Sequence, residues 1–161
     1  MKNNVCNVVF GGVGGQGILT ASEICALAAL NDGYHVKKSE IHGMAQRGGS
    51  VESHVRFGSK VYSPLVTPGH ADFLVCFHYE EIDRLKPFLK KDGINLAGYL
   101  DKAKDFIPDV RFLNVFLVGV LSGHLKIKED SWINALKKVF PEKYIKQNLQ
   151  VFNDGRSAGK K

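Results

Sequence analysis

The residues between positions 40 and 51 bring together groups that bind anions or protein partners. They include the acid Glu40, the imidazole of His42, the amide of Gln46 and the fixed cation of Arg47, with three glycines among them. Glycine permits positive φ and a close approach of the backbone to a ligand, and the planar guanidinium of Arg47 suits a carboxylate or a phosphate. This composition predicts a loop for a ligand or a partner. The same residues also suit a turn whose His and Arg bond the protein's own carbonyl groups.

A second glycine-rich segment follows the apolar run of residues 5–10. Gly12, Gly14 and Gly17 fit the pattern G-x-G-x-x-G at the start of an Ala- and Leu-rich stretch, residues 15–31. In that context a tight turn leads into a helix whose exposed N–H groups attract anions. A single match is weak evidence for a dinucleotide, because the same glycines would also pack a helix closely against a sheet. Contact with a phosphate or with a partner stays open at this turn.

These segments need a sheet to position them. The order strand, glycine turn, helix and strand over residues 5–38 begins a doubly wound α/β sheet. The later strands are predicted at 50–57, 71–77 and 94–96, and the later helices at 79–91, 111–125, 131–140 and 141–152. At 161 residues and 44% hydrophobic content the chain builds one core. We expect a single three-layer, Rossmann-like domain over residues 1–161 with a mostly parallel sheet and a flexible polar tail, residues 153–161.

Two of these elements bear on partners. Residues 50–57 alternate between two faces, and we expect the polar one, made by Ser50, Glu52, His54 and Arg56, to continue the polar surface of the loop. Residues 111–125 are apolar on nearly every side, which is typical of a helix that is central or faces another subunit. We therefore expect apolar surface that a partner, or a second copy of the chain in a homodimer, covers.

Composition narrows the function classes. The net charge of +6 comes without a zinc spacing or an aromatic-interleaved basic stripe, so it favours an anionic ligand or an acidic partner over nucleic acid. The three cysteines are dispersed, and none of the six histidines has the spacing of a metal-binding pair, so we expect no disulfide, iron–sulfur cluster or metal site. The sequence also contains no nucleophile motif, so we expect no catalytic residue. The cysteines indicate reducing cytoplasm. The first apolar run is too short for a signal peptide or a membrane span.

Three segments carry a resemblance to a known family. Residues 8–19, 39–51 and 53–58 resemble the gamma-type domain of 2-oxoacid:ferredoxin oxidoreductases, and the sequence His-Gly-Met-Ala-Gln-Arg-Gly-Gly is similar to the small-subunit branch of enzymes that act on indolepyruvate. Further similar segments are 62–65, 71–74 and 114–121. Family members carry some extra residues, about a strand and a helix, between the strand near 94 and the helix near 114. In this chain only residues 97–109 connect that strand and that helix, so the domain is shortened relative to the family.

The resemblance implies a role in a larger enzyme. In this family a large subunit holds thiamine diphosphate, magnesium and [4Fe-4S] clusters, a 2-oxoacid is decarboxylated to acyl-coenzyme A, and ferredoxin accepts the electrons. The gamma-type domain packs beside that machinery on the coenzyme A side, so this chain is expected to bind no cofactor alone and to be inactive in isolation. The residues expected to contact coenzyme A are Gly12, Gly14, Gln16, Gly17, His42, Gln46, Arg47, Gly48 and Gly49. Arg47 would bond a phosphate or an interface carboxylate.

Two other classes of function remain open. A nucleotide-binding dehydrogenase would use the glycine turn for a dinucleotide and Glu40 for its ribose. A purely structural assembly module would use Arg47 only at the subunit interface.

Overall fold

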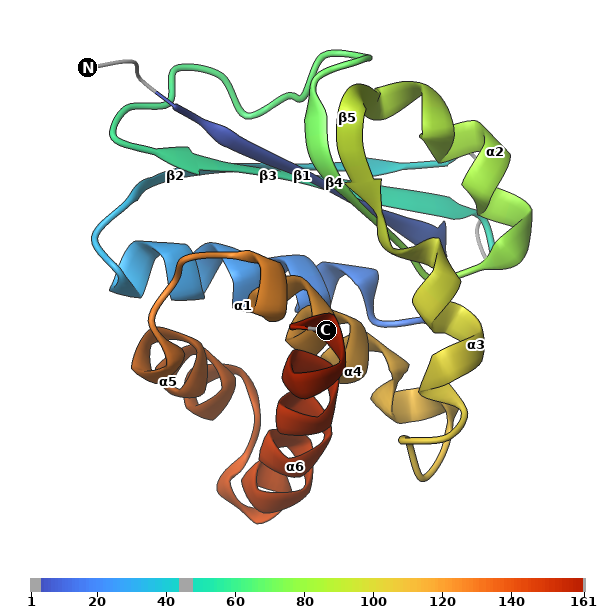
Figure 1. Cartoon of the computed structure of the whole chain (residues 1–161), viewed down its shortest axis with the longest axis vertical. Coiled ribbons are helices and arrows are strands. Elements are labelled where there is room, and N and C mark those ends of the chain that lie inside the picture. The colour runs from blue at the N-terminus through green and yellow to red at the C-terminus, as the bar shows by residue number, and fades with distance from the viewer. Residues whose placement is uncertain (1–3, 44–47, 161) are drawn as a thin grey trace.

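A five-stranded sheet organises the computed structural model, which describes residues 4–43 and 48–160 (Figure 1). The strand order is β2-β3-β1-β4-β5. The strands are β1 (Cys6–Val13), β2 (His35–His42), β3 (Ser50–Gly58), β4 (Ala71–Cys76) and β5 (Leu89–Asn95). The α-helices are α1 (Ile18–Asn31), α2 (Ile82–Leu85), α3 (Tyr99–Ala103), α4 (Leu113–His124), α5 (Glu129–Val139) and α6 (Glu142–Gly159). Short 3-10 helices are η1 (Tyr79–Glu81), η2 (Lys86–Phe88), η3 (Leu96–Gly98) and η4 (Val110–Phe112).

The sheet is mostly parallel in strand direction, as predicted. β1 pairs parallel with β4, and β4 with β5, whereas β3 pairs antiparallel with both β1 and β2. Four strands therefore run the same way and β3 alone runs against them. β2 and β3 are joined by a short connection, and a short connection between neighbouring strands permits only the antiparallel arrangement.

The two faces of the sheet are covered unequally. Alternate residues of β1 point to opposite sides, so Val8 and Phe10 enter the core under the long helices, while Val9 packs on the other face against Leu74 and Leu85. Figure 1 shows α1, α4, α5 and α6 on one side of the sheet and α2 on the other. The expected three-layer α/β domain is confirmed, with a thin third layer built from the α2 region and the connection that contains Val66.

Helix α4 is the central helix of the domain. Residues from Asn114 to Ser122 are buried, and α4 packs against α6, α1 and β4. The chain itself covers this apolar helix, so the central position, one of the two alternatives, is confirmed. The expectation that this helix leaves apolar surface for a second copy or a partner is wrong. None of the described helices is long and apolar enough to cross a bilayer.

Glycines allow α4 and α6 to touch through their backbones. A Cβ at Gly155 would overlap the carbonyl oxygen of Phe116, and a Cβ at Gly159 would overlap that of Val120. On α4, Gly119 meets the backbone of α6 in the same way. Small residues spaced four apart permit this close approach of two helices, although the rule is best known from membranes. The predicted flexible tail is therefore wrong for residues 153–159, which form the last two turns of α6.

One predicted helix is broken into pieces. Residues 79–91 were expected to be helical, but helical structure ends at Phe88 and Leu89 already begins β5. Pro87 lies in η2 and has no N–H to donate, and its ring clashes with the preceding turn of an α-helix. Asp92 and Gly93, which directly follow the predicted helix, lie within β5.

Glu52 and His54 on the polar face of β3 are buried, contrary to the expectation that this face continues an exposed polar surface, whereas Arg56 is half-buried. Glu52 is 7% exposed and His54 is 1% exposed. The Nε2 atom of His54 lies 2.7 Å from Glu52 Oε2, and its Nδ1 accepts the N–H of Val66 at 3.0 Å. Because Nδ1 accepts, the proton is on Nε2, which donates to the carboxylate. Arg84 Nη1 donates to the other oxygen, Oε1, at 2.7 Å.

The α4–α6 contact predicts that adding one methyl group at this contact destabilises the fold. Gly155→Ala places a Cβ against a main-chain carbonyl that cannot rotate away, so we expect unfolding free energy to fall by about 1–3 kcal/mol or more, as for overpacked cores. Thermal denaturation of the full chain measures this. Gly98→Ala is the matched control, because Gly98 has φ −60° and nothing lies within 4 Å of its added Cβ. That control should be neutral or stabilising, and equal loss in both variants would contradict the packing argument.

The buried Glu52 predicts a pH-dependent stability. The hydrogen bond from His54 lowers the pKa of Glu52 most, burial opposes this, and Arg84 adds to the lowering. The ionised form therefore stabilises the fold above the unfolded pKa of about 4.3, and that contribution is lost as pH falls through the lower folded pKa.

We expect Glu52→Gln to lower the free energy of unfolding by about 1–3 kcal/mol at neutral pH. The difference from wild type should shrink below about pH 4.3. Urea unfolding at several pH values measures both quantities. Asp105→Asn, at an exposed position, serves as the control and should track the wild type throughout. A deficit for Glu52→Gln that is constant with pH would refute the ionised pair.

Candidate functional site

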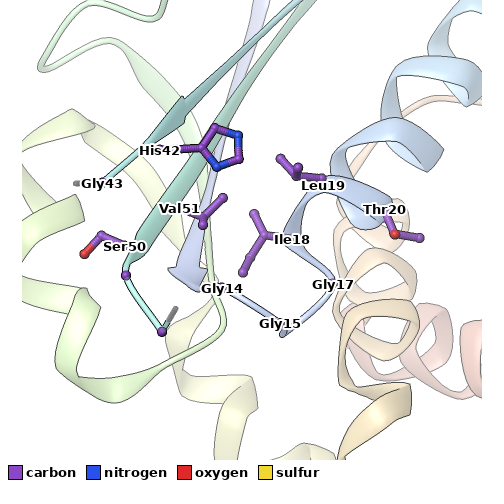
Figure 2. A pocket seen from close by; sticks show the side chains of 12 residues that line it. Gly14, Gly15, Gly17, Ile18, Leu19, Thr20, His42, Gly43, Ser50 and Val51 are labelled. Atoms are coloured by element: carbon purple, nitrogen blue, oxygen red, sulfur yellow. The ribbon is translucent and has the colours of Figure 1, made fainter. Parts of the chain in front are cut away.

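The two glycine segments of the sequence meet at one end of the sheet and enclose a pocket of about 560 Å³ (Figure 2). One backbone hydrogen bond joins them, since the N–H of Gly14 donates to the carbonyl of Gly49 at 2.9 Å. The register of β1 and β3 makes this possible, because Val13 pairs with Ser50. The lining residues are Gly14, Gly15, Gly17, Ile18, Leu19, Thr20, His42, Gly43, Gly48, Gly49, Ser50 and Val51.

The first turn of α1 supplies hydrogen-bond donors to this pocket. Gly17 caps the helix with φ 80°, and among residues 4–43 and 48–160 no side chain accepts from the helix end. The first backbone bond that closes the helix runs from Ala21 N–H to the Gly17 carbonyl at 3.0 Å. The N–H groups of Ile18, Leu19 and Thr20 thus have no carbonyl partner within the helix. With no acid in the first turn, the positive end of the helix dipole favours an anion here.

Apolar side chains make up much of the remaining wall. Figure 2 shows Ile18 and Leu19 from α1, Val51 from β3 and His42 from β2 pointing toward one another. His42 is exposed on the rim, whereas Ile18 is 2% exposed. The pocket therefore offers backbone N–H donors on one side and an apolar surface with an imidazole on the other. This combination suits a slender ligand that carries both an anionic group and an uncharged arm.

Five of the predicted site residues line the pocket: Gly14, Gly17, His42, Gly48 and Gly49. Gln46 and Arg47 lie outside the described residues.

Gly12 and Gln16 are placed elsewhere. Gly12 lies in β1, where an added Cβ would be 2.7 Å from Gln16 Oε1 and 2.9 Å from Phe77 Cβ. The side chain of Gln16 is used internally, because Oε1 accepts from Val13 N–H at 2.8 Å and Nε2 donates to the Phe77 carbonyl at 2.9 Å. Both residues brace the turn from β1 into α1 and do not line the pocket.

Several lining residues were missed by sequence reasoning. Ile18, Leu19 and Thr20 follow directly on the glycine motif, and a helix that begins at such a motif exposes the N–H groups of its first three residues. Ser50 and Val51 follow directly on the second glycine pair. Sequence position relative to the two motifs was thus the signal that could have found them.

The cysteines are not placed as nucleophiles. Burial raises the pKa of the Cys6 thiol to about 12, with Asp72 adding to the shift, and it raises the pKa of the fully buried Cys25 further still. A reactive cysteine needs a lowered pKa and access to solvent. Over the part of the chain that the structure describes, no three His, Cys, Asp or Glu side chains come together to hold a metal ion.

The topology also bears on the dinucleotide hypothesis. In a dinucleotide-binding fold the strand after the first helix lies next to the first strand, so that its terminal acid reaches the ribose. Here β3 lies between β1 and β2. Glu40, the candidate acid, lies in the outer strand β2 and pairs with Lys38 Nζ at 2.9 Å. Both observations argue against a dinucleotide at the glycine turn.

Comparison with solved structures shows the same fold in proteins of low sequence identity. The gamma subunit of keto/oxoacid ferredoxin oxidoreductase from Geobacter sulfurreducens superposes with a TM-score of 0.79 at 23% identity, covering 96% of this chain and 98% of that one. A 2-oxoglutarate:ferredoxin oxidoreductase chain from Magnetococcus marinus, solved with 2-oxoglutarate, coenzyme A and succinyl-CoA bound, gives 0.80 at 20% identity. That superposition covers 99% of this chain and 32% of the longer Magnetococcus marinus chain.

Sequence comparison identifies the family. Indolepyruvate oxidoreductase subunit IorB of Thermococcus kodakarensis is 34% identical over an alignment of 193 positions, which covers 96% of both chains. The family profile matches residues 7–102 and 99–158, two pieces that overlap within the shortened segment 97–109. The predicted resemblance to 2-oxoacid:ferredoxin oxidoreductases is confirmed. The chain belongs to the pyruvate ferredoxin/flavodoxin oxidoreductase family.

Proposed function

We propose that this chain is the small subunit of a cytoplasmic indolepyruvate:ferredoxin oxidoreductase, and that its pocket holds part of coenzyme A. The assembled enzyme would convert the 2-oxoacid, coenzyme A and oxidised ferredoxin into acyl-coenzyme A, carbon dioxide and reduced ferredoxin. The larger partner subunit would carry thiamine diphosphate, magnesium and the [4Fe-4S] clusters, which supply the decarboxylation and the electron transfer. This chain would contribute binding and orientation only.

The pocket is the observation that carries the coenzyme A assignment. Coenzyme A combines phosphate groups with a long uncharged pantetheine arm. The N–H groups at the start of α1, which have no carbonyl partner within the helix, suit a phosphate, and the surface made by Ile18, Leu19 and Val51 suits the arm. An added Cβ at Gly15 would meet nothing within 4 Å, so this wall leaves the backbone open to a ligand. The residues present fit the molecule.

The relatives support the family of reaction and its substrate. The similar protein from Thermococcus kodakarensis is named for indolepyruvate, and the structurally similar chain from Magnetococcus marinus belongs to an enzyme structure with coenzyme A bound. On this proposal His42 orients the ligand at the rim. Arg47 and Gln46 would add a guanidinium and an amide from the connection between β2 and β3. Three free cysteines within the described residues, Cys6, Cys25 and Cys76, are in keeping with a reducing compartment.

Arg47 gives the direct test of the coenzyme A assignment. Lysine keeps the charge but cannot donate in the planar, bidentate geometry of guanidinium. Loss of one hydrogen bond to a charged group costs about 1.5–3 kcal/mol, roughly ten- to a hundredfold in affinity. In the enzyme assembled with its native large subunit, Arg47→Lys should raise the KM for coenzyme A by that factor and leave decarboxylation without coenzyme A unchanged.

The control for that experiment is Arg111→Lys, because Arg111 is paired locally with Asp109 at 2.9 Å on the surface. It should behave as wild type. If Arg47→Lys instead makes the subunits separate on dilution, with unchanged KM, the residue serves only the interface. Wild-type kinetics and assembly together would remove Arg47 from the site.

The division of labour between subunits gives a second test. Purified alone, the chain should be colourless and inactive, with no stoichiometric iron or thiamine diphosphate. Co-purified with its partner, it should give an enzyme whose kcat/KM is higher for indolepyruvate than for pyruvate or 2-oxoglutarate. Metal and cofactor analysis followed by ferredoxin-linked assays measures both. A brown isolated chain with acid-labile sulfide would refute the first statement, and a preference for pyruvate would refute the second.

A further inference from the structure

We propose that the connection between β3 and β4, residues 59–70, is a preformed docking surface for the large catalytic subunit, with Tyr62 and Leu65 as its central contacts. The identity of that partner rests on the proposed function, whereas the fixed shape of the surface does not. Figure 1 shows the connection on the side of the sheet away from α1 and α4. β3 begins at the pocket and ends at this connection, so its nine residues separate the two by roughly 26 Å at about 3.3 Å per residue.

Two histidines of the sheet hold the connection from beneath. His35 Nδ1 in β2 accepts the N–H of Val61 at 2.9 Å, and His54 Nδ1 in β3 accepts the N–H of Val66 at 3.0 Å. The side chains of both valines are buried, at 2% and 3% exposed. His54 is itself fixed, because its other nitrogen lies 2.7 Å from Glu52. The backbone of the connection is therefore tied down at two points that lie five residues apart.

An arginine and an asparagine add two more ties from the same sheet. Arg56 Nη1 donates to the carbonyl of Ser63 at 2.7 Å, and Asn7 Nδ2 donates to the carbonyl of His70 at 3.0 Å. The two side chains also bond each other, since Arg56 Nε donates to Asn7 Oδ1 at 2.8 Å. Such bonds occupy polar groups of a segment that has no helix or strand of its own. The connection thus has one defined shape.

This fixed backbone presents two large apolar side chains to solvent. Tyr62 is 82% exposed and Leu65 is 49% exposed, although each stands directly beside a buried valine. Pro64, between them, restricts the backbone further. Tyrosine is enriched at protein interfaces and often carries much of the binding energy. A surface that is already ordered loses little conformational entropy when a partner binds. These features favour a docking surface over an unused loop.

Charge indicates what kind of partner fits. Lys60 Nζ lies 5.8 Å from the centre of the Tyr62 ring, and residues 53–71 contain Arg56 and Lys60 but no Asp or Glu. A complementary surface therefore has an apolar pocket for the ring and carboxylates beside it. A second copy of the chain does not meet this description. A two-fold symmetric contact at this surface would bring each Lys60 against the same positive surface, so we assign it to the large subunit.

Association with the purified native large subunit tests the docking surface. Tyr62→Ala and Leu65→Ala should each raise the Kd at least about tenfold, as truncation of a central interface side chain does. Isothermal titration calorimetry with the full chain measures this. Thermal denaturation of each variant alone should match wild type, because both side chains are exposed.

Tyr144→Ala is the matched control. Tyr144 is 49% exposed on α6, and Lys143 Nζ lies 4.9 Å from the centre of its ring. It is thus a second exposed lysine–tyrosine pair outside the docking surface, and its variant should bind the large subunit as wild type does. An equal loss of affinity in Tyr144→Ala would overturn the proposal, as would a wild-type Kd for Tyr62→Ala.

The charge argument has its own measurement. Lys60→Glu should lower the association rate constant about tenfold at low salt, and the difference from wild type should shrink as salt is added, because salt screens exposed charges. Stopped-flow mixing of the two subunits measures these rates. An association rate constant that Lys60→Glu leaves unchanged at low salt would overturn the assignment to an acidic partner surface.

Two further outcomes separate this inference from the proposed function. Because the docking surface is remote from the pocket, Tyr62→Ala enzyme at concentrations well above its Kd should keep the wild-type KM for coenzyme A. A raised KM under those conditions would overturn the separation of the two sites. A wild-type homodimer that Tyr62→Ala breaks would overturn the choice of partner and leave the coenzyme A assignment untouched. Failure of the wild-type chain to bind the large subunit would overturn both proposals.

Discussion

The close contact between the backbones of α4 and α6 sets the position of most other parts of the domain. Gly119, Gly155 and Gly159 allow main chain to lie against main chain, with no room for a side chain at any of the three positions. This contact places α4 in the centre, where its first turn presents Asn114 to Gly17. The start of α1 is fixed in turn, and with it the row of N–H groups that faces the pocket. A helix contact far from the ligand pocket therefore determines the pocket's geometry.

The second constraint is the antiparallel strand between β1 and β2. Because β3 pairs with β1 in a register that sets Ser50 opposite Val13, the connection between β2 and β3 emerges beside the glycine turn. In a dinucleotide-binding fold this position belongs to a parallel strand and its acid. The insertion of β3 replaces an acid that binds ribose with a second glycine segment. The same glycine motif thus serves a different kind of pocket.

Much of the fold could be predicted from the sequence where local chemistry decides it. The strand, glycine turn and helix at residues 5–31 follow from the apolar pattern and the glycines, and Gly33, with φ 92°, comes just after the end of α1. The broken helix was missed although Pro87 marks it. The last turns of α6 were missed because Gly155 and Gly159 suggest a tail when read locally, and only the facing glycines of α4 explain them. Alternation in β3 showed two faces, but it did not show that a short helix covers Glu52 and His54.

The site was predictable in part for the same reason. Composition located the glycines and His42, since those residue types are unusual together. It did not separate Gly14, which lines the pocket, from Gly12 and Gln16, which turn inward, because direction depends on where α1 and β4 pack. The hydrogen bond from Arg84 to Glu52 was not visible at all, since the two residues lie 32 positions apart in the sequence.

A pocket wall made of main chain limits which residues of the site can be substituted during evolution. Gly15 and Gly17 have positive φ, so nearly any substitution there strains the backbone, and the wall has almost no neutral variants. The side chains of Leu19, His42 and Val51 face the same space without that restriction. Drift toward a new ligand would therefore proceed through these three positions, over an anion-binding wall that stays the same.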